Sequence, residues 1–381
     1  MKILIVGAGI AGLTLAALLK QRGFAPELID HQYDFSDAGY MLGLFPLGCR
    51  ILYGLGLIDE YLEQTVPLED YWMRDDKGRT LQKMSLAAIF SAYGPYRCFS
   101  RDVLLRILLK ACDGLTIKMG MALTNLQQNS SDVRVTFSDG RLADYDLVVG
   151  ADGMYSNVRR LVFDSSEFRY YDTGWGGWVW WTDDANLPSQ TAMECWGTNY
   201  FLGTYPAKQK MGVILASKNN QTQVPHNSGR KKALQCAMPE LTRHFPTTFE
   251  QIPEDDAPLF YWPLKDVQCQ HWFRKQVVLV GDAVIGFLPT AGIGASMAME
   301  SAAVLAEELA RTDKQHLEWA LQLYEKRRQQ RVLAVQRDSR RLAQYMLVKS
   351  PLLVALRNQL LRYYPVKSLM KSINKSFMMP I

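Results

Sequence analysis

The first 30 residues contain the feature that most constrains the fold. Residues 2–6 (KILIV) are almost entirely apolar and predict a buried strand, while residues 10–22 predict a helix. Between them lies the turn Gly7-Ala8-Gly9-Ile10-Ala11-Gly12, whose glycines have the spacing G-x-G-x-x-G. A strand that enters a helix through this turn indicates a parallel α/β fold with a dinucleotide bound at the helix N-terminus.

Each glycine of this turn has its own expected role. Gly7 permits the tight turn, Gly9 lets the backbone approach a pyrophosphate, and Gly12 lets the helix pack on the strand. Residues 26–30 (PELID) predict a second strand, which ends in Asp30. An acid about 20 residues after the glycines is placed to accept hydrogen bonds from an adenosine ribose. Residues 1–19 also look like the start of a secretion signal, but no small-residue cleavage site follows.

Two further turns follow predicted strands later in the chain. The apolar residues 147–149 lead into Gly150-Ala151-Asp152-Gly153, and residues 277–280 lead into Gly281-Asp282. Residues 289–294 contain one proline and two glycines and precede a predicted helix over 295–311. Asp152 could equally be a helix-capping residue with no ligand. Two carboxylates and three turns fit a ligand longer than a mononucleotide, and FAD is such a ligand.

These three motifs, in this order and spacing, resemble those of the single-component FAD-dependent aromatic hydroxylases. That family includes salicylate-hydroxylase-like, quinolone-hydroxylating and ubiquinone-pathway monooxygenases. The resemblance implies an α/β protein with a Rossmann-like FAD-binding domain, an inserted β-sheet substrate domain and C-terminal helices. It places the FAD-binding domain at 1–70, 97–167 and 267–330, the substrate domain at 71–96 and 168–266, and the basic C-terminal helices at 331–381.

The same resemblance implies which residues hold the cofactor. Residues 98–104 (CFSRDVL) are similar to a pattern whose arginine, here Arg101, meets the FAD phosphates. Asp282 would bond the ribityl or pyrophosphate part, and the backbone of residues 292–295 would face the flavin ring. The 150–153 turn, with Asp146, Ser156 and Arg159, is similar to a motif that touches both FAD and the nicotinamide donor. The expected FAD-binding residues are Gly7, Gly9, Ala11, Gly12, Asp30, Arg101, Asp152, Gly281, Asp282, Pro289, Gly292, Gly294 and Ala295.

The implied reaction uses NADH or NADPH and molecular oxygen. The nicotinamide, which docks transiently, reduces FAD, and a flavin hydroperoxide then hydroxylates an aromatic or quinone-like small molecule. The cofactor carries the difficult chemistry, so the absence of a catalytic triad from the sequence is expected. No general base can be named, although His226, His244 and His271 lie in the substrate half or at its boundary.

Several positions depart from the family pattern. Ile285 stands where a histidine is usual, Leu47 where an asparagine is common, and Ile293 and Ser296 where relatives often carry glutamine or asparagine. These departures keep open a catalytically impaired FAD-fold binding protein. A flavin-dependent halogenase or epoxidase and a plain NAD dehydrogenase are further alternatives. The tryptophan-rich residues 178–182 lack the Ile-Pro ending of the halogenase pattern, and the two later glycine turns argue against a dehydrogenase.

Aromatic residues and basic charge are unevenly distributed along the chain. The expected strands of residues 168–216 contain Trp175, Trp178, Trp180, Trp181, Trp196 and Tyr200, which predict either an aromatic pocket or a sheet face packed on helices. Residues 219–230 predict a polar loop. Residues 326–381 carry 13 Lys and Arg and one acid, whereas the preceding residues carry 30 basic and 37 acidic side chains. This tail either contacts an anionic membrane peripherally or packs on the FAD-binding domain with its charges solvated.

Cysteine and histidine usage bears on metals and location. The six cysteines form no CxxC pair and the five histidines do not cluster, so we expect reduced thiols, no metal and a cytoplasmic protein. We expect no nucleic-acid partner.

Overall fold

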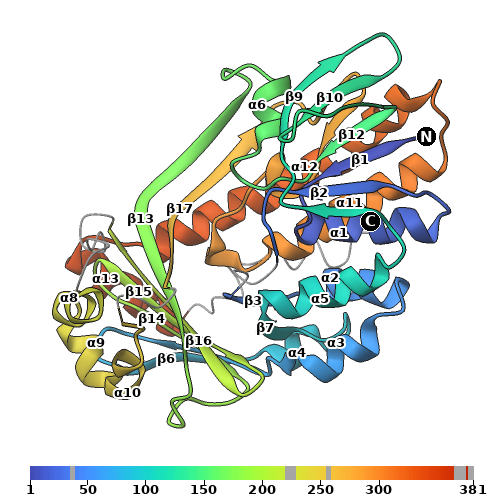
Figure 1. The fold of residues 1–381 in the computed structure, drawn as a ribbon. Coiled ribbons are helices and arrows are strands. Elements are labelled where there is room, and N and C mark those ends of the chain that lie inside the picture. The colour runs from blue at the N-terminus through green and yellow to red at the C-terminus, as the bar shows by residue number, and fades with distance from the viewer. Residues whose placement is uncertain (35–38, 219–228, 255–258, 364–374, 376–381) are drawn as a thin grey trace.

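The computed structural model describes residues 1–34, 39–218, 229–254, 259–363 and 375. Figure 1 shows a parallel sheet with its helices in the upper part of the molecule and a second, larger sheet below it. Two paired strands run from one part to the other. The predicted α/β class, with a β-sheet insertion and C-terminal helices, is confirmed.

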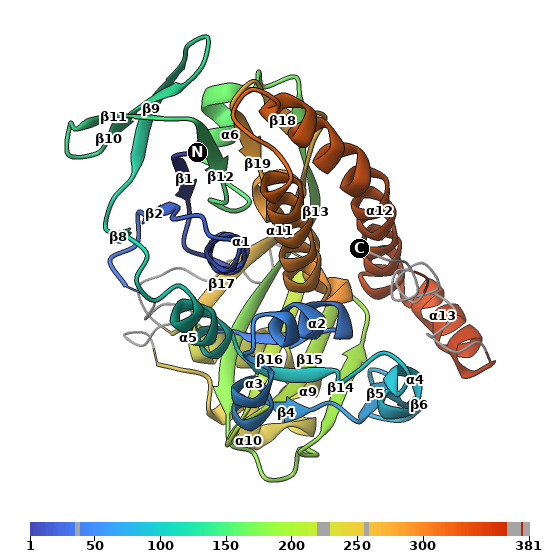
Figure 2. The same ribbon diagram turned by 90° about the vertical axis from the view of Figure 1, so that its right-hand side faces the viewer.

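The upper sheet has six strands in the order β18-β19-β12-β1-β2-β8, and only β18 is antiparallel to its neighbour. Its strands are β18 (Phe273–Arg274), β19 (Val277–Leu279), β12 (Leu147–Gly150), β1 (Ile3–Val6), β2 (Glu27–Asp30) and β8 (Ile117–Met119). The three central strands are buried at every position, which explains their continuous apolar sequences. The helices α1 (Ile10–Gln21) and α11 (Gly294–Ala310) contact each other beside this sheet (Figure 2). The strands and helices expected around the three glycine motifs are therefore present.

The lower sheet has seven strands in the order β17-β13-β16-β15-β14-β5-β6. Its strands are β17 (Phe260–Cys269), β13 (Phe168–Thr182), β16 (Lys210–Lys218), β15 (Tyr200–Ala207), β14 (Thr191–Trp196), β5 (Asp70–Arg74) and β6 (Thr80–Ser85). β13 and β17 are the two strands that connect the two parts in Figure 1. Both segments expected to form an inserted domain contribute strands to this sheet, and their boundaries remain predictions.

One face of the lower sheet is covered by three short helices, α8 (Arg230–Ala237), α9 (Pro239–His244) and α10 (Pro246–Glu250). The described residues also form two small sheets. One consists of β3 (Met41–Leu44), β7 (Arg97–Ser100) and β4 (Val66–Pro67), and the other of β11 (Leu142–Tyr145), β10 (Val133–Phe137) and β9 (Leu123–Gln128). In the part of the chain that the structure describes, the other helical elements before α11 are α2 (Pro46–Gly54), α3 (Ile58–Gln64), α4 (Leu86–Phe90), α5 (Arg101–Ala111), α6 (Asn157–Val162), η1 (Gly281–Ala283) and η2 (Pro289–Ala291).

Two helices whose bounds fall within the described residues follow α11 along the chain. The long helix α12 (Leu317–Met346) packs on α11, as expected for a tail that covers the parallel-sheet part. The helix expected to restart at Ser350-Pro351 is α13 (Pro351–Tyr363), and it contacts β6 of the lower sheet instead. Searching the described residues finds no helix with the length and apolar character needed to cross a membrane. The rest of the tail, 364–374 and 376–381, and most of the expected polar loop at 219–230 lie outside the described residues.

Candidate active site

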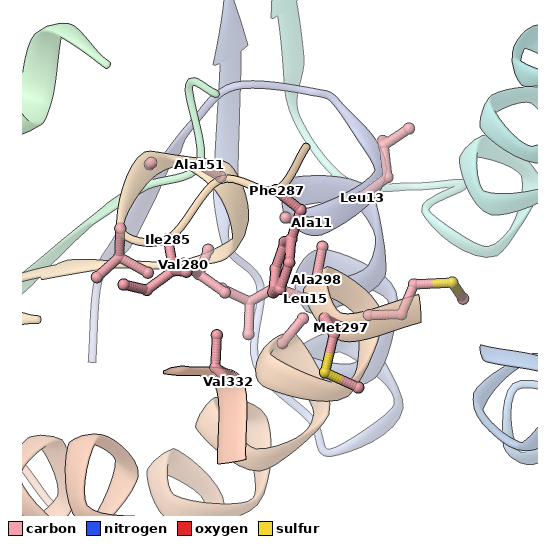
Figure 3. Packing of buried hydrophobic residues seen from close by; sticks show 14 of the residues in the cluster. Ala11, Leu13, Leu15, Ala151, Val280, Ile285, Phe287, Met297, Ala298 and Val332 are labelled. Carbon is pink, nitrogen blue, oxygen red and sulfur yellow. The ribbon is translucent and has the colours of Figure 1, made fainter. Parts of the chain in front are cut away.

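The three glycine turns meet at one edge of the parallel sheet. They follow β1, β12 and β19, which are neighbours, so their carboxyl ends lie side by side. Gly7 has a φ of +110°, and a Cβ there would lie 2.4 Å from the carbonyl oxygen of Ala151. Gly281 has a φ of +63°, and its Cβ would lie 2.9 Å from that of Ala11. Figure 3 shows Ala11 of α1 close to Ala298 of α11 at this junction. Side chains at these glycines would force the turns apart.

Gly12 and Gly9 differ sharply in the space around them. A Cβ on Gly12 would lie 1.9 Å from the carbonyl oxygen of Gly7, so any side chain there separates helix α1 from β1. A Cβ on Gly9 would meet only Nη2 of Arg101, at 3.9 Å. Gly9 is therefore open on the side that a ligand would approach.

A cavity of about 650 Å³ extends from this edge to the lower sheet. It connects residues of the glycine turns with residues of β5, β14 and β15. Eight expected cofactor residues line it: Gly9, Ala11, Arg101, Asp282, Pro289, Gly292, Gly294 and Ala295. The other five, Gly7, Gly12, Asp30, Asp152 and Gly281, lie outside its lining.

Charges of both signs lie at the glycine-turn end of the cavity. Burial raises the pKa of Asp282 to about 6, while the positive charge of Arg101 opposes this increase. Among the described residues, no donor forms a hydrogen bond with the Asp282 carboxylate. Arg101 stands beside Gly9 at the N-terminus of α1, with its guanidinium carbon 5.6 Å from the centre of the Tyr40 ring. This end therefore offers an open acceptor for a hydroxyl and a cation with free helix amides for a phosphate.

Asp30 and Asp152 are each engaged with nearby backbone. Oδ2 of Asp30 accepts a hydrogen bond of 2.7 Å from the N–H of Ala8, inside the first glycine turn. The carboxylate of Asp152 accepts hydrogen bonds from the hydroxyl of Ser156 at 2.5 Å and from the N–H groups of residues 157 and 158. Ser156 is the N-cap residue of α6, and Asp152 supports this helix start by accepting from the cap hydroxyl and from the first two helical N–H groups. This agrees with the helix-capping interpretation of Asp152. Contacts of both carboxylates with a cofactor stay predictions.

Asp146 and Arg159 lie away from the cavity lining. Asp146 precedes β12 and pairs with Lys314 at 2.5 Å, at the strand end opposite the glycine turns. The buried guanidinium of Arg159 donates to the carbonyl oxygens of Ala283 and Met154, both at 2.6 Å. Arg159 thus ties α6 to the 281–283 turn, and its expected contact with a nicotinamide stays a prediction.

Aromatic side chains surround the remainder of the cavity. Phe45 and Tyr96 stack with their ring centres 4.3 Å apart, and Tyr40 and Trp262 make an edge contact at 5.2 Å. At the lower sheet the cavity also contains the buried acid Glu194, which sequence reasoning missed. The available signal was a single acid within TAMECW, a strand that is buried at all six positions.

The aromatic residues of 168–216 were expected either to line a pocket or to pack on helices, and both arrangements occur. Of the six aromatic residues singled out in the sequence, only Trp196 lines the cavity. Trp178 and Trp180 pack on the opposite face of the sheet with residues of α8, α9 and α10. The indole N–H of Trp180 donates to the carbonyl oxygen of Thr248 at 3.1 Å. Most of the pocket's aromatic lining therefore comes from other segments.

The departures from the family pattern lie mostly outside the cavity. Ile285 is 1% exposed and packs in the core shown in Figure 3. Leu47 is fully buried, and the hydroxyl of Ser296 accepts a hydrogen bond of 3.1 Å from the N–H of Phe45. Only Ile293 contributes to the lining. Of the three histidines considered as bases, His244 and His271 do not line the cavity, and His226 lies outside the described residues.

Residues 1–339 match the model of the family described as "FAD binding domain", and the chain belongs to this family. It is 25% identical over 317 residues to a flavin-dependent monooxygenase of Legionella longbeachae, covering 81% of this chain and 80% of the relative. It is 27% identical to the 2-heptyl-3-hydroxy-4(1H)-quinolone synthase of Pseudomonas aeruginosa, covering 96% and 94%. The structure of Klebsiella pneumoniae HpxO with FAD and uric acid has a TM-score of 0.87, 22% identity, and coverage of 99% and 97%.

The polar groups that line the cavity fit FAD. An open carboxylate, an arginine and the N-termini of α1 and α11 can together take the hydroxyls and phosphates of a dinucleotide. The expected family, cofactor and enzyme class are confirmed, and the chain is an FAD-dependent monooxygenase.

Proposed function

We propose that this protein hydroxylates a planar aromatic or quinone-like small molecule, using FAD, NADH or NADPH, and molecular oxygen. The observation that carries the proposal is the single cavity that joins the glycine-turn edge to an aromatic-lined end at the lower sheet. The quinolone synthase named above has a bicyclic aromatic product by its name, which agrees with this substrate class.

Each end of the cavity has its own task in this proposal. Arg101 and the N-terminus of α1, which lie at one end of the cavity, would hold the FAD phosphates, and Asp282 would accept a hydrogen bond from a ribityl hydroxyl. The backbone of 289–295 would contact the flavin, and the remaining lone pairs of Asp30, which already accepts from the N–H of Ala8, would be available to the adenosine ribose. When bound, FAD supplies the activation of oxygen. The aromatic walls orient the substrate ring and keep water from the reacting atoms.

Isotope labelling tests the reaction type. The proposed balance is that substrate C–H, oxygen, NAD(P)H and a proton give substrate C–OH, water and NAD(P)⁺. The FAD-loaded protein would be incubated under ¹⁸O₂ with NADH or NADPH and a panel of phenols, quinolones and quinones. We expect a product that carries one ¹⁸O atom, as seen by mass spectrometry. Product oxygen drawn from water, or no product from a protein that retains FAD, would contradict hydroxylation.

We also propose that α13 contacts an anionic membrane surface. Its outer face exposes apolar side chains to between 52% and 80%, namely Leu352, Leu353, Leu356, Leu360 and Tyr363. The exposed bases Lys349 and Arg362 lie at the two ends of this helix. An apolar face with flanking positive charge suits the interface of an anionic bilayer. Such a location would give the cavity access to lipophilic rings.

Vesicle binding tests this second proposal. Vesicles of phosphatidylcholine with phosphatidylglycerol should sediment the protein, and vesicles of phosphatidylcholine alone should do so less. The double variant Leu352→Ser and Leu356→Ser should reduce binding about tenfold or more, because two exposed leucines lose their apolar contact. Leu142→Ser, which alters a leucine exposed to 63% on β11, is the matched control and should bind normally. Equal binding by both variants would rule out α13 as the contact.

A further inference from the structure

Glu194 lies at the lower-sheet end of the cavity, where it can contact a bound substrate. It lies on β14, where side chains alternate between the two faces of the sheet. Ala192, Glu194 and Trp196 line the cavity, whereas Met193 and Cys195 pack on the opposite face. The pleat of β14 therefore directs one buried carboxyl group into the chamber that the aromatic walls enclose.

Three neutral donors converge on this carboxyl group. Tyr71 of β5 and Tyr205 of β15 donate their hydroxyls at 2.6 Å, and the indole N–H of Trp196 donates at 2.8 Å. Two of these bonds end on Oε2 and one on Oε1. A carboxylate has about four acceptor sites, so one site on Oε1 remains. Tyr71 and Tyr205 use their protons on Glu194 and so present oxygen lone pairs to the cavity they line.

No cation compensates this carboxylate from within the cavity. Among the described residues that line it, the only lysine or arginine side chains are Arg101 and Lys265. Arg101 lies at the glycine-turn end, and Lys265 is paired with Asp172 at 3.0 Å. Arg357 of α13 donates to the carbonyl oxygen of Trp196 but does not line the cavity. Burial raises the pKa of Glu194, and its three hydrogen bonds oppose that increase.

A site that offers only hydrogen-bond acceptors and a negative charge should favour ligands that carry a hydrogen-bond donor and disfavour ligands that are negatively charged. A ring substituent with an N–H or O–H can occupy the remaining site of Glu194. A ring carboxylate would bring a second buried negative charge beside the first, which is unfavourable because neither charge is neutralised by a cation. The hydroxyls of Tyr71 and Tyr205 cannot donate hydrogen bonds to such a ring carboxylate, because they already donate their protons to Glu194.

We propose that Glu194, held by Tyr71, Tyr205 and Trp196, makes the site specific for neutral planar substrates that carry an N–H or O–H donor and excludes aromatic carboxylates. This inference rests on the proposed function and specifies the substrate class for it. Glu194 is a specificity-determining residue in this account, and no proton transfer to it during the reaction is required.

Binding to the FAD-loaded protein tests the proposal without turnover. Matched pairs of ligands would be titrated at pH 8 without nicotinamide, and the flavin difference spectrum would report the dissociation constant. The pairs are phenol with salicylate, and 4-hydroxyquinoline with its 2-carboxylate. We expect each neutral compound to bind about 100-fold or more tightly than its carboxylate partner, from the cost of juxtaposed like charges.

Glu194→Gln should change the preference itself. The variant removes the negative charge but keeps the side-chain shape. Neutral donors should bind about tenfold more weakly and carboxylates more tightly, so that the preference falls to about tenfold or less. Glu318→Gln, the same change on an exposed side chain of α12, should keep the wild-type preference. If Glu194→Gln does not retain FAD, Tyr205→Phe serves instead and should shift the preference, because it frees an acceptor site on Oε1.

Three results would overturn the proposal. These are carboxylates that bind the wild type as well as their neutral partners, an unchanged preference in both variants, and no spectral change with any of the four compounds at millimolar concentration. The proposed function can fail separately. A protein that shows the preference but incorporates no ¹⁸O would keep this recognition site and lose the assigned reaction.

Discussion

The two ends of the cavity differ in the chemical groups that form them: backbone at one end and side chains at the other. At the glycine-turn end, three short turns present backbone amides, and glycines are needed wherever two chain segments touch. At the lower-sheet end, the surface includes Tyr71 of β5, Glu194 of β14 and Tyr205 of β15. β14 and β15 are consecutive along the chain, whereas β5 lies more than 100 residues earlier. The first end depends on local spacing and the second on strand pairing. We therefore expect mutations at the glycine-turn end to change the affinity for FAD and mutations at the lower-sheet end to change the affinity for the substrate.

Glycine substitutions in the first turn should have the largest effect. Gly12→Ala places a methyl group 1.9 Å from the carbonyl oxygen of Gly7. We expect the free energy of unfolding to fall by about 3 kcal/mol or more, since the clash is with backbone that cannot move aside, and we expect FAD to be lost. Urea unfolding and the flavin content of the purified protein measure the two effects.

Gly9→Ala is the informative partner of that variant. Its methyl group meets only a flexible arginine at 3.9 Å, so stability should change by less than about 1 kcal/mol. The dissociation constant of FAD should nevertheless rise about tenfold, because the methyl group lies where the pyrophosphate approaches. Gly54→Ala, at a helical glycine with nothing within 4 Å of its Cβ, is the control. Normal FAD affinity in Gly9→Ala would contradict the assignment of this edge.

Two tryptophans on opposite faces of the lower sheet allow a smaller test. Trp180 and Trp196 are 2% and 1% exposed, but only Trp196 lines the cavity. Trp180→Phe should lower the free energy of unfolding by about 2 kcal/mol, through lost packing and the lost bond to Thr248. It should leave the affinity for 4-hydroxyquinoline unchanged, whereas Trp196→Phe should weaken it. A change in the affinity for 4-hydroxyquinoline in Trp180→Phe would contradict the claim that only one face of the lower sheet contacts the substrate.

The smallest effect concerns Asp282 and has a defined pH dependence. Its pKa is raised to about 6 in the folded protein, so its contribution to stability is complete below about pH 4 and is lost as pH rises to about 6. Without FAD, Asp282→Asn should be about 1–2 kcal/mol more stable than wild type at pH 7.5, an estimate that allows for screening by water in the cavity. About a third of this difference should remain at pH 4.5, because that pH still lies above the ordinary pKa of an aspartate. Its FAD affinity should fall about tenfold. Urea unfolding of apoprotein at the two pH values provides the measurement.

Asp146→Asn should show the opposite sign. Burial acts against it, but the ion pair with Lys314 and the N–H of Lys2 lower the pKa of Asp146. A lowered pKa stabilises the folded protein at neutral pH and loses this effect as pH falls. Asp146→Asn should therefore be less stable than wild type at pH 7.5. If both variants shift stability in the same direction, the electrostatic explanation of the Asp282 effect is wrong.

The same contrast explains how much of the site could be predicted. Gly9 was expected from the spacing of the first turn, because a turn between a strand and a helix is specified locally. Arg101, Asp282 and the glycines of 289–295 were expected from the family resemblance. All of these residues line the cavity, and their contacts with FAD stay predictions. Glu194 was not found, since its neighbours Tyr71 and Tyr205 reach it only through the pairing of β14 with β5 and β15. The pairing of β14 with β5 joins segments more than 100 residues apart, and no local pattern encodes its register. The sequence left open whether the tryptophans line a pocket or pack on helices, because strand residues on both faces share one composition.

Ile285 illustrates the same limit from the other direction. The sequence pattern made it the main reason to consider lost catalysis, yet its side chain belongs to the core and not to the cavity. The position of a residue within a motif does not determine which way its side chain points.

The most direct test of the central claim is the reaction of the bound flavin with a nicotinamide. The purified protein would be mixed anaerobically with NADH and then NADPH, and the loss of visible flavin absorbance followed with and without phenols, quinolones and quinones. The account predicts bleaching that at least one neutral donor-bearing ring accelerates many-fold, since both ends of one cavity must then be filled together. A flavin that stays oxidised with both nicotinamides and every ring would contradict it and favour a binding role.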